Sequence, residues 1–526
     1  MVHVSALVIT FSLSLLYPIA KAIYNVAFHP LSNVPGPSNW AASRIPFIRC
    51  LLRGTLVQDV ERLHRKYGQV VRIAPDEVTF AHPDAWTEIL QPRPGRQQFL
   101  KDALWWSEPS PKSLINAIDP ATHARIRKTL VPAFTSGALK AQEPIIQRYV
   151  SLLIERLRQQ VHAAEVADGS TNGAVVDIFP WLNFTTFDVF GDLGFGESFN
   201  CLEHSEYHPW IALIFDNIKA IAFVNSVKFY PALDWLLTRC IPASLKKVQA
   251  DHFQQVVDKV RRRMNWEVTR EDLMFHTLKE AKEGQGMSLD EIDYTFAALT
   301  IAGSETTATV LGGIVNFLSA DGARCRLLSD EVRSAFASEA EITLSRVGGL
   351  EYMNGVINEG LRLCPPVPWI LPRRVPAGGE RVCGVWLAGG TAVSIQQYVL
   401  NRDPALFHDA SSFVPERWLA GEDSQAASPY ASDQRGAVQA FSVGPRSCLG
   451  KQLAWAEMRL IVARLVWAFD ITAAGRERDG GGGGGALQWE HLRTFLLVEK
   501  RAIAVRLRRR QARAGGRAEG GASGSA

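Results

Sequence analysis

The sequence predicts a mainly helical protein with small β-sheets, and three observations carry that prediction. Helical periodicity dominates residues 123–318, short Val- and Gly-rich segments near both ends indicate strands, and residues 2–20 form an apolar run. The chain has 526 residues, 47% of them hydrophobic and 9% aromatic, and a net charge of +4. This composition excludes a disordered or collagen-like chain and predicts a packed globular body. The length alone suggests about three domains.

The apolar run at the N-terminus is predicted to be a membrane anchor. Residues 2–20 carry no charged side chain apart from His3, and a helix of that length spans about 29 Å, close to the thickness of a bilayer core. A cleaved secretory signal is the alternative, because Ala20-Lys21-Ala22 resembles a small-x-small cleavage site. Cations follow the run at Lys21, Arg44, Arg49 and Arg53, and none precedes it, which places the rest of the chain in the cytosol. We therefore expect an uncleaved anchor over residues 1–28 and a proline-rich hinge over residues 29–40.

The basic character of the chain lies in its C-terminal tail. The last 27 residues contain eight cations and one anion, so they carry +7 and leave −3 for the remainder. A basic nucleic-acid-binding face on the folded body is therefore not expected. Residues 511–526, rich in Gly, Ala, Ser and Arg, are predicted to be a disordered tail.

The β-structure is predicted in three places. A short helix ends at Lys66-Tyr67-Gly68 and leads into strands at residues 70–73 and 78–80. Residues 381–394 are predicted to form short strands, and residues 494–507 alternate like a hairpin.

Residues 288–318 are predicted to form a long, buried central helix. Ser288-x-x-Glu291 is a capping box, and Glu305 is the only charged residue after Asp293. A glycine in a helix costs about 1 kcal/mol relative to alanine, and an unpaired buried carboxylate costs more. The segment Ala302-Gly303-Ser304-Glu305-Thr306-Thr307 is thus either a tolerated polar patch or a functional site.

Cys448 differs from the other six cysteines, which are expected to be buried, inert thiols. It lies in Phe441-Ser442-Val443-Gly444-Pro445-Arg446-Ser447-Cys448-Leu449-Gly450, directly before a helical stretch at residues 451–469. The two glycines permit a tight loop, Arg446 supplies a positive charge, and the helix presents free N–H groups and the positive end of its dipole. All three stabilise a thiolate, which is either a nucleophile or a metal ligand. No sequence signal marks a general base for a nucleophile, so metal ligation is the sharper hypothesis.

The pattern Phe-x-x-Gly-x-Arg-x-Cys-x-Gly, matched at Phe441, Gly444, Arg446, Cys448 and Gly450, resembles the haem-binding loop of the cytochrome P450 monooxygenases. Further motifs in the order of that family are the segment 302–307, Glu359-Gly360-Leu361-Arg362 and Phe413-Val414-Pro415-Glu416-Arg417-Trp418. The resemblance spans the chain from the anchor to the final hairpin. It implies one haem-enclosing catalytic domain over residues 41–510. Segments at residues 28–31, 67–77 and 183–188 resemble the fungal secondary-metabolism branch near the isotrichodermin hydroxylases.

The resemblance implies haem b as the cofactor, with Cys448 as the axial thiolate ligand of its iron and O2 as the co-substrate. A thiolate ligand donates electron density through the iron and favours O–O cleavage. Thr306 is implied to hold water and oxygen at a local opening of the helix, and Glu305 to pass protons to the distal oxygen. A buried structural network, whose loss should cost folding and haem retention together, is implied at Glu359, Arg362 and Arg417.

Two further groups of residues follow from the resemblance. The haem propionates need cations, and the candidates are His123, Arg127, Arg373 and Arg446. The substrate pocket is expected to be apolar, which suits a lipophilic terpenoid, polyketide or alkaloid. Its candidate residues are Trp105, Trp106, Phe296, Ala302, Val367, Trp369 and Ile370.

The expected function is hydroxylation or epoxidation of a lipophilic secondary metabolite in a fungal biosynthetic pathway. No flavin- or nicotinamide-binding motif occurs in the chain, so electrons are expected from a separate NADPH–cytochrome reductase. That reductase is expected to dock near Cys448, at Arg446 and Lys451. The expected location is the endoplasmic reticulum membrane, single-pass, with the catalytic domain facing the cytosol. The alternatives are a haem-thiolate isomerase or dehydratase that rearranges a peroxide without O2, and a non-catalytic haem-binding sensor or electron carrier.

Overall fold

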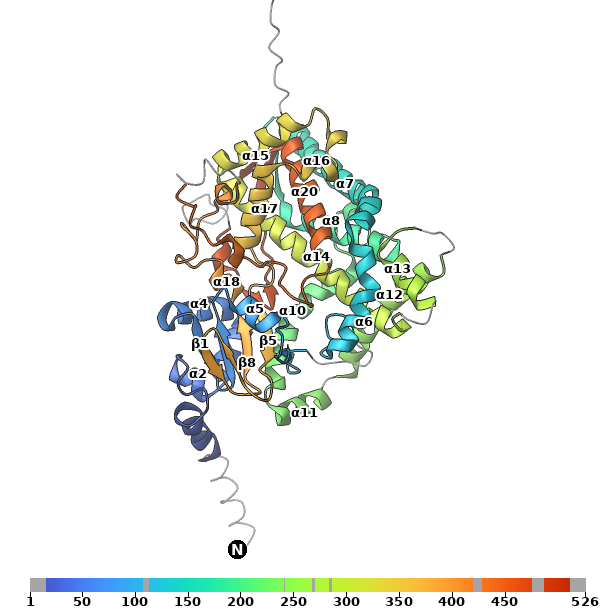
Figure 1. The fold of residues 1–526 in the computed structure, drawn as a ribbon. Helices are drawn as coiled ribbons and strands as arrows, with labels where there is room; N and C mark the ends of the chain where they lie inside the picture. Colours follow the sequence, from blue (N-terminus) through green and yellow to red (C-terminus); the bar gives the residue numbers. More distant parts are fainter. Residues whose placement is uncertain are drawn as a thin grey trace, which may run out of the picture.

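Figure 1 shows the computed structural model of the protein, in which a helical body adjoins a smaller part built around a β-sheet. The structure describes residues 16–106, 113–169, 171–240, 242–266, 270–282, 286–419, 428–474 and 487–510. The expected tail, residues 511–526, and the first fifteen residues of the expected anchor lie outside the described residues. The predicted class, mainly helical with small sheets, is confirmed.

Helices form most of the described chain. Those near the N-terminus are α2 (Ser38–Ala42), α3 (Ile45–Arg53), α4 (Leu56–Tyr67) and α5 (Ala85–Leu90). The others are α6 (Pro120–Leu130), α7 (Ser136–Asp168), α8 (Ile178–Phe195), α9 (Cys201–His204), α10 (Pro209–Lys228), α11 (Pro231–Cys240), α12 (Ala243–Met264), α13 (Leu273–Lys282), α14 (Leu289–Ala320), α15 (Gly322–Ala335), α16 (Leu344–Val347), α17 (Glu351–Leu363), α18 (Gln397–Leu400) and α20 (Lys451–Ala468).

The predicted central helix is α14, which packs against α8, α17 and α20 (Figure 1). Both halves of the capping box are made: the Glu291 N–H donates to the Ser288 hydroxyl (3.2 Å), and the Ser288 N–H donates to the Glu291 carboxylate (2.9 Å). A Cβ at Gly303 would collide with the ring of Phe190, so glycine allows α8 to approach. Among the described helices, α14 alone is long and apolar enough to cross a membrane. Because 67% of its most apolar window is buried inside the protein, it is a core helix.

A five-stranded sheet has the order β1-β2-β8-β5-β3. Its strands are β1 (Val70–Ala74), β2 (Glu77–Phe80), β8 (Ala392–Ile395), β5 (Ile370–Arg374) and β3 (Leu100–Lys101). The strands predicted within residues 381–394 correspond to β8 and to a separate pair, β6 (Glu380–Val382) and β7 (Val385–Leu387). The β2–β8 pair is parallel, and the other neighbours are antiparallel. At the edge, β3 pairs Lys101 with Arg373, which brings two cations together.

The predicted hairpin at residues 494–507 is wrong in its pairing. Only β10 (Thr494–Phe495) and β11 (Leu497–Val498) pair with each other, around Leu496, whose φ is 73°. The following strand, β12 (Ala504–Arg509), lies between β4 (Ala174–Asp177) and β9 (Phe469–Ala473) in a separate sheet. Alternation marks a strand but not its partner, because the partner is decided by distant parts of the chain.

The segment expected to be a hinge, residues 29–40, is largely packed onto β1. Leu31 is fully buried, and its carbonyl accepts a hydrogen bond from the Arg72 guanidinium (3.3 Å). The Arg72 N–H donates to the Pro35 carbonyl (2.7 Å), and a Cβ at Gly36 would collide with the Arg72 carbonyl. From Leu31 onward the segment is therefore part of the folded domain.

Candidate active site

The Cys448 loop ends where α20 begins and is closed by the backbone. The Cys448 N–H donates to the carbonyl of Phe441 (2.8 Å). Gly444 has a φ of 78°, and a Cβ there would collide with the carbonyl of Leu90, so this position requires glycine. Gly450, the N-cap of α20, has a φ of −83° and no protein atom near the place of a Cβ. Among the protein atoms, nothing at this position requires glycine.

The Cys448 side chain is exposed, although the protein around it desolvates its sulfur. This burial raises the pKa of the thiol, while the Gly450 N–H and the charges of Arg127 and Lys451 lower it to a lesser extent. The environment alone thus stabilises the thiolate only in part. A metal cation bound to the sulfur would supply the rest of the stabilisation, because a coordinating thiol is deprotonated outright.

The cations expected to bind propionates converge on one place. We call them, with one addition, the cation group: Lys101, His123, Arg127, Arg373 and Arg446. Burial and the charges of the other four members lower the pKa of His123 to about 3. Burial and Arg446 lower the pKa of Arg373 to about 9, and burial with Arg373 and Arg446 lowers that of Lys101 to about 6. Lys101 was missed from the sequence because its strand is two residues long and only pairing with β5 brings it to the site.

The cation group is tied to the Cys448 loop through its arginines. The Arg127 guanidinium donates to the Ser447 carbonyl (2.8 Å). Arg446 is not among the groups that lower the pKa of the thiol, contrary to expectation. Its guanidinium donates to the carbonyls of Ala117 (2.5 Å) and Ile118 (2.7 Å). These contacts hold the loop against the chain segment that leads into α6.

The donor set fits a haem. Within the described part of the chain, no carboxylate forms an ion pair with Lys101, His123, Arg127 or Arg373, whereas the adjacent Arg374 pairs with Asp76 and Asp102. Partly buried cations without a counter-charge are costly, and a dianion placed among them removes that cost. A haem supplies two carboxylates for the cation group and an iron for the Cys448 sulfur.

Thr306 and Ala302 lie one turn apart on a half-buried face of α14. The Thr306 hydroxyl donates to the Ala302 carbonyl (2.6 Å). The expected local opening of the helix is wrong for this structure, because α14 is α-helical from Leu289 to Ala320 and the hydroxyl is satisfied by its own helix.

Glu305 lies on the neighbouring stripe of α14 and is almost fully buried, at 1% exposure. The Asn183 amide on α8 donates to its Oε1 (3.1 Å), and the Lys500 ammonium lies 2.9 Å from its Oε2. The carboxylate is therefore paired, and the cost of an isolated buried charge does not arise. Neither partner was identified from the sequence, because each reaches Glu305 only through the fold.

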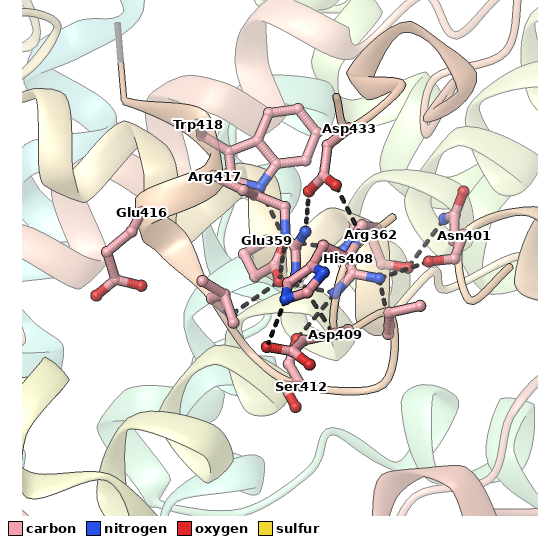
Figure 2. Close-up of polar contacts among 12 residues, drawn as sticks. Glu359, Arg362, Asn401, His408, Asp409, Ser412, Glu416, Arg417, Trp418 and Asp433 are labelled. Carbon is pink, nitrogen blue, oxygen red and sulfur yellow. Dashed lines mark hydrogen bonds and ion pairs between the residues drawn. The ribbon is translucent and has the colours of Figure 1, made fainter. Parts of the chain in front are cut away.

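The predicted network at Glu359, Arg362 and Arg417 is present and fully buried (Figure 2). Arg362 donates to both oxygens of Glu359 (2.7 and 2.9 Å), and Arg417 donates to Oε1 (3.1 Å). Although burial raises the pKa of Glu359, the hydrogen bond and charge of Arg362 and the charge of Arg417 bring it below its ordinary value.

Figure 2 also shows two members of this network that the sequence analysis missed. The Trp418 indole donates to Glu359 Oε2 (2.8 Å), and Asp433 pairs with Arg417. Asp433 also accepts a hydrogen bond from the His408 N–H (2.7 Å). The network thus joins α17 to residues 408–418 and to Asp433, before the Cys448 loop.

The substrate candidates divide into core and accessible residues. Trp105 and Trp369 are buried against each other, with ring centroids 5.3 Å apart, and both contact Phe47. Phe296 is fully buried and packs on Phe195 (6.1 Å), so its expected pocket role is wrong and it belongs to the core. The candidates that keep accessible surface are Trp106, Ala302, Val367 and Ile370.

A helical body with a cysteine-bearing loop and a group of cations suited to two propionates defines a haem-thiolate protein. The sequence matches the cytochrome P450 family over residues 35–479, and the chain belongs to that family. It is 39% identical to cytochrome P450 monooxygenase lcsI of Purpureocillium lilacinum, over 95% of this chain and 93% of that protein. It is 40% identical to cytochrome P450 monooxygenase astJ of Aspergillus oryzae, over 93% of this chain and 94% of that protein. It is also 40% identical to averantin hydroxylase of Dothistroma septosporum, over 87% of this chain and 83% of that protein. The protein is a cytochrome P450 monooxygenase that uses haem and O2.

Proposed function

We propose that the protein hydroxylates or epoxidises a lipophilic secondary metabolite of the terpenoid, polyketide or alkaloid class. The observation that carries the proposal is the Cys448 loop tied to the cation group by the hydrogen bond from Arg127 to the Ser447 carbonyl. The similarity to a protein named averantin hydroxylase supports hydroxylation as the reaction. Trp106, Val367 and Ile370 supply apolar surface of the sort that such substrates contact.

The haem, when bound, supplies the oxidising chemistry that inserts one oxygen atom of O2 into the substrate. The residues of this chain hold the haem and supply the protons that the reaction needs. Cys448 would bind the haem iron through its sulfur, and the cation group would neutralise the propionates. The hydroxyl of Thr306 holds a proton close to where oxygen is reduced, and Glu305, one residue before it, exchanges protons with that position. Glu359, Arg362 and Arg417 keep the surrounding chain folded.

Electrons come, in this proposal, from a separate NADPH–cytochrome reductase that docks on the face near Cys448. Lys451 is exposed at the first position of α20 and is suited to an acidic partner. Arg446 is not suited, because its guanidinium is occupied by the carbonyls of Ala117 and Ile118.

We further propose a single-pass anchor in the endoplasmic reticulum membrane, with the catalytic domain in the cytosol. Residues 16–27 are helical and carry exposed apolar side chains, among them Leu16 (60%), Ile19 (57%) and Ile23 (57%). Helix α11 lies at the same end of the molecule (Figure 1). It has no buried residue and exposes Leu233, Trp235 and Leu236. Apolar surface gathered at one end supports a membrane-facing side.

Replacing the proposed ligand tests the assignment. In the reduced, CO-bound protein we expect the red-shifted Soret band of thiolate ligation, and we expect Cys448→Ser to lose it. Cys383→Ser is the matched control, since this half-buried cysteine lies in the β6–β7 turn region, and it should keep the band. An unchanged spectrum in Cys448→Ser would exclude the ligand assignment.

A second experiment distinguishes a monooxygenase from an isomerase or dehydratase. A monooxygenase should form product in proportion to the NADPH consumed, and it should form none from a hydroperoxide in the absence of reductase.

A further inference from the structure

The ion pair between Glu305 and Lys500 joins the middle of α14 to the C-terminal segment between β11 and β12. The Lys500 ammonium lies 2.9 Å from Glu305 Oε2 and donates to the Thr309 hydroxyl (2.6 Å) and to the Glu305 carbonyl (3.5 Å). It also lies 4.8 Å from the ring centroid of Phe179 on α8. Lys500 is thus held by several groups and is not a loosely placed surface lysine.

This pair determines which way the carboxylate points. Glu305 and Thr309 are four residues apart and share one stripe of α14, while Ala302 and Thr306 form the neighbouring stripe. Glu305 Oε1 accepts a hydrogen bond from Asn183, and Oε2 lies 2.9 Å from the Lys500 ammonium in an ion pair without hydrogen-bond geometry. The Thr306 hydroxyl is directed at the Ala302 carbonyl. Glu305 is therefore held beside the Thr306 position and is not hydrogen-bonded to it.

The same pair connects a buried carboxylate to solvent. The side chain of Glu305 is 1% exposed, and that of Lys500 is 19% exposed. The Oδ1 atom of Asn183 is buried and accepts no hydrogen bond within the described part of the chain, so it can accept one from a water molecule. A proton that enters along Lys500 thus meets polar atoms as far as Glu305.

We propose that Lys500 is a positioning residue for the proton supply of the monooxygenase, acting through Glu305. In this role Lys500 stabilises the ionised form of Glu305, which is the state of the carboxylate before and after each proton transfer. Glu305 takes a proton from solvent water, passes it toward the Thr306 hydroxyl and returns to the charged form beside the ammonium. Without Lys500, giving up the proton would leave an unpaired charge in the core, so burial would keep Glu305 as the neutral acid. The inference rests on the proposed function for its consequence in turnover, but not for the protonation state itself.

Infrared spectroscopy of the haem-loaded, resting protein tests the protonation state directly. The wild-type protein already contains a protonated, buried carboxyl group at Glu457, so the test is a difference spectrum against the wild-type protein. We expect Lys500→Met to show an additional carbonyl-stretch band of a protonated, buried carboxyl group, and the double variant Lys500→Met/Glu305→Gln to lack this additional band. Arg501→Met is the matched control, because this neighbouring cation is 56% exposed and pairs with Glu499, and it should show no additional band. Absence of the additional band in Lys500→Met would overturn the proposal.

Turnover with reductase tests the consequence. We expect Lys500→Met to release severalfold more hydrogen peroxide per NADPH oxidised, Lys500→Arg to remain near the wild-type value, and Lys500→Met to add nothing in the Glu305→Gln background. Additive effects of the two substitutions would overturn the proposal, because Lys500 would then act independently of Glu305. If Lys500→Met does not retain haem, Lys500→Gln replaces it in the same comparisons, because the glutamine amide can still form hydrogen bonds but carries no charge. A red-shifted CO spectrum without any turnover in the wild-type protein would count against the proposed function and leave the infrared result standing.

Discussion

At Lys101, burial and the charges of Arg373 and Arg446 lower the pKa to about 6, so this lysine is held among like charges in the protein alone. Its ammonium donates to the Ile115 carbonyl and lies 3.9 Å from the ring centroid of Trp106. A site that keeps a lysine under such repulsion is built for an anion. We therefore expect Lys101 to join the arginines proposed to hold the haem propionates, and its contact with Trp106 would place that group beside the proposed pocket.

At the same scale, the role of Thr306 is testable by removing its hydroxyl. Thr306→Ala removes only a hydroxyl on the half-buried face of α14, so we expect haem binding to be retained. Product formation should fall by about 10²-fold, the lower end of what a positioned proton-transfer group contributes, while NADPH oxidation continues. The measurement is product formed per NADPH oxidised. Thr307→Ala is the control, because the Thr307 hydroxyl also donates to a carbonyl of its own helix (3.1 Å) but the residue is buried. Equal losses in both variants would refute the specific role of Thr306.

Among the elements, the central helix could be predicted from sequence because its signals are local. The capping box at Ser288 and Glu291 and the long apolar run lie within the helix itself. The network around Glu359 could be predicted only in part, since Glu359 and Arg362 are three residues apart, whereas Asp433 joins it from a distant segment. The pairing of β12 and the contact of Lys500 with Glu305 could not be predicted, because both depend on where distant strands place the chain. Motifs within one element can therefore be predicted from the sequence, whereas contacts between distant segments cannot.

Helix α20 contains a buried acid that makes stability depend on pH. Glu457 is 3% exposed, its Oε2 accepts no hydrogen bond within the described residues, and burial raises its pKa well above the ordinary value. The folded protein thus holds it neutral, while in the unfolded chain it ionises above a pH of about 4.3. The unfolded state is then favoured increasingly as the pH rises, by about 1.4 kcal/mol per pH unit until the folded-state pKa is reached.

Glu457→Gln removes this titration. We expect the variant to be more stable than the wild-type protein at neutral pH, with an advantage that shrinks as the pH falls toward 4.5. Thermal unfolding of the haem-loaded protein between pH 5 and 8 measures the difference. Glu351→Gln, at the first residue of α17 and exposed, is the control and should show no such slope. A difference that is constant across this pH range would contradict the assignment of a neutral Glu457.

For the whole molecule, the distribution of exposed apolar residues bears on the proposed membrane attachment. Residues 16–27 and α11, which carry exposed apolar side chains, lie at one end of the molecule (Figure 1). Trp235 is 61% exposed and Arg239 stacks on its ring at 3.8 Å, an aromatic-cation pair typical of a membrane interface. Large apolar side chains contribute about 1.5–3 kcal/mol each when fully buried, so we expect α11 to provide a second, weaker membrane attachment beside the proposed anchor.

If both the N-terminal segment and α11 contact the membrane, removing them one after the other should weaken membrane binding in two steps. We expect the full chain to stay with membranes in alkaline carbonate, and deletion of residues 2–28 to leave a form that carbonate releases but that still binds phospholipid vesicles. In that shortened form, Trp235→Glu with Leu236→Glu should reduce vesicle binding by at least about tenfold, since two buried apolar side chains are lost. Trp386→Glu, which changes a tryptophan 57% exposed on β7, should leave it unchanged. Release of the full chain by carbonate would refute the anchor, and equal binding of both glutamate variants would refute the contribution of α11.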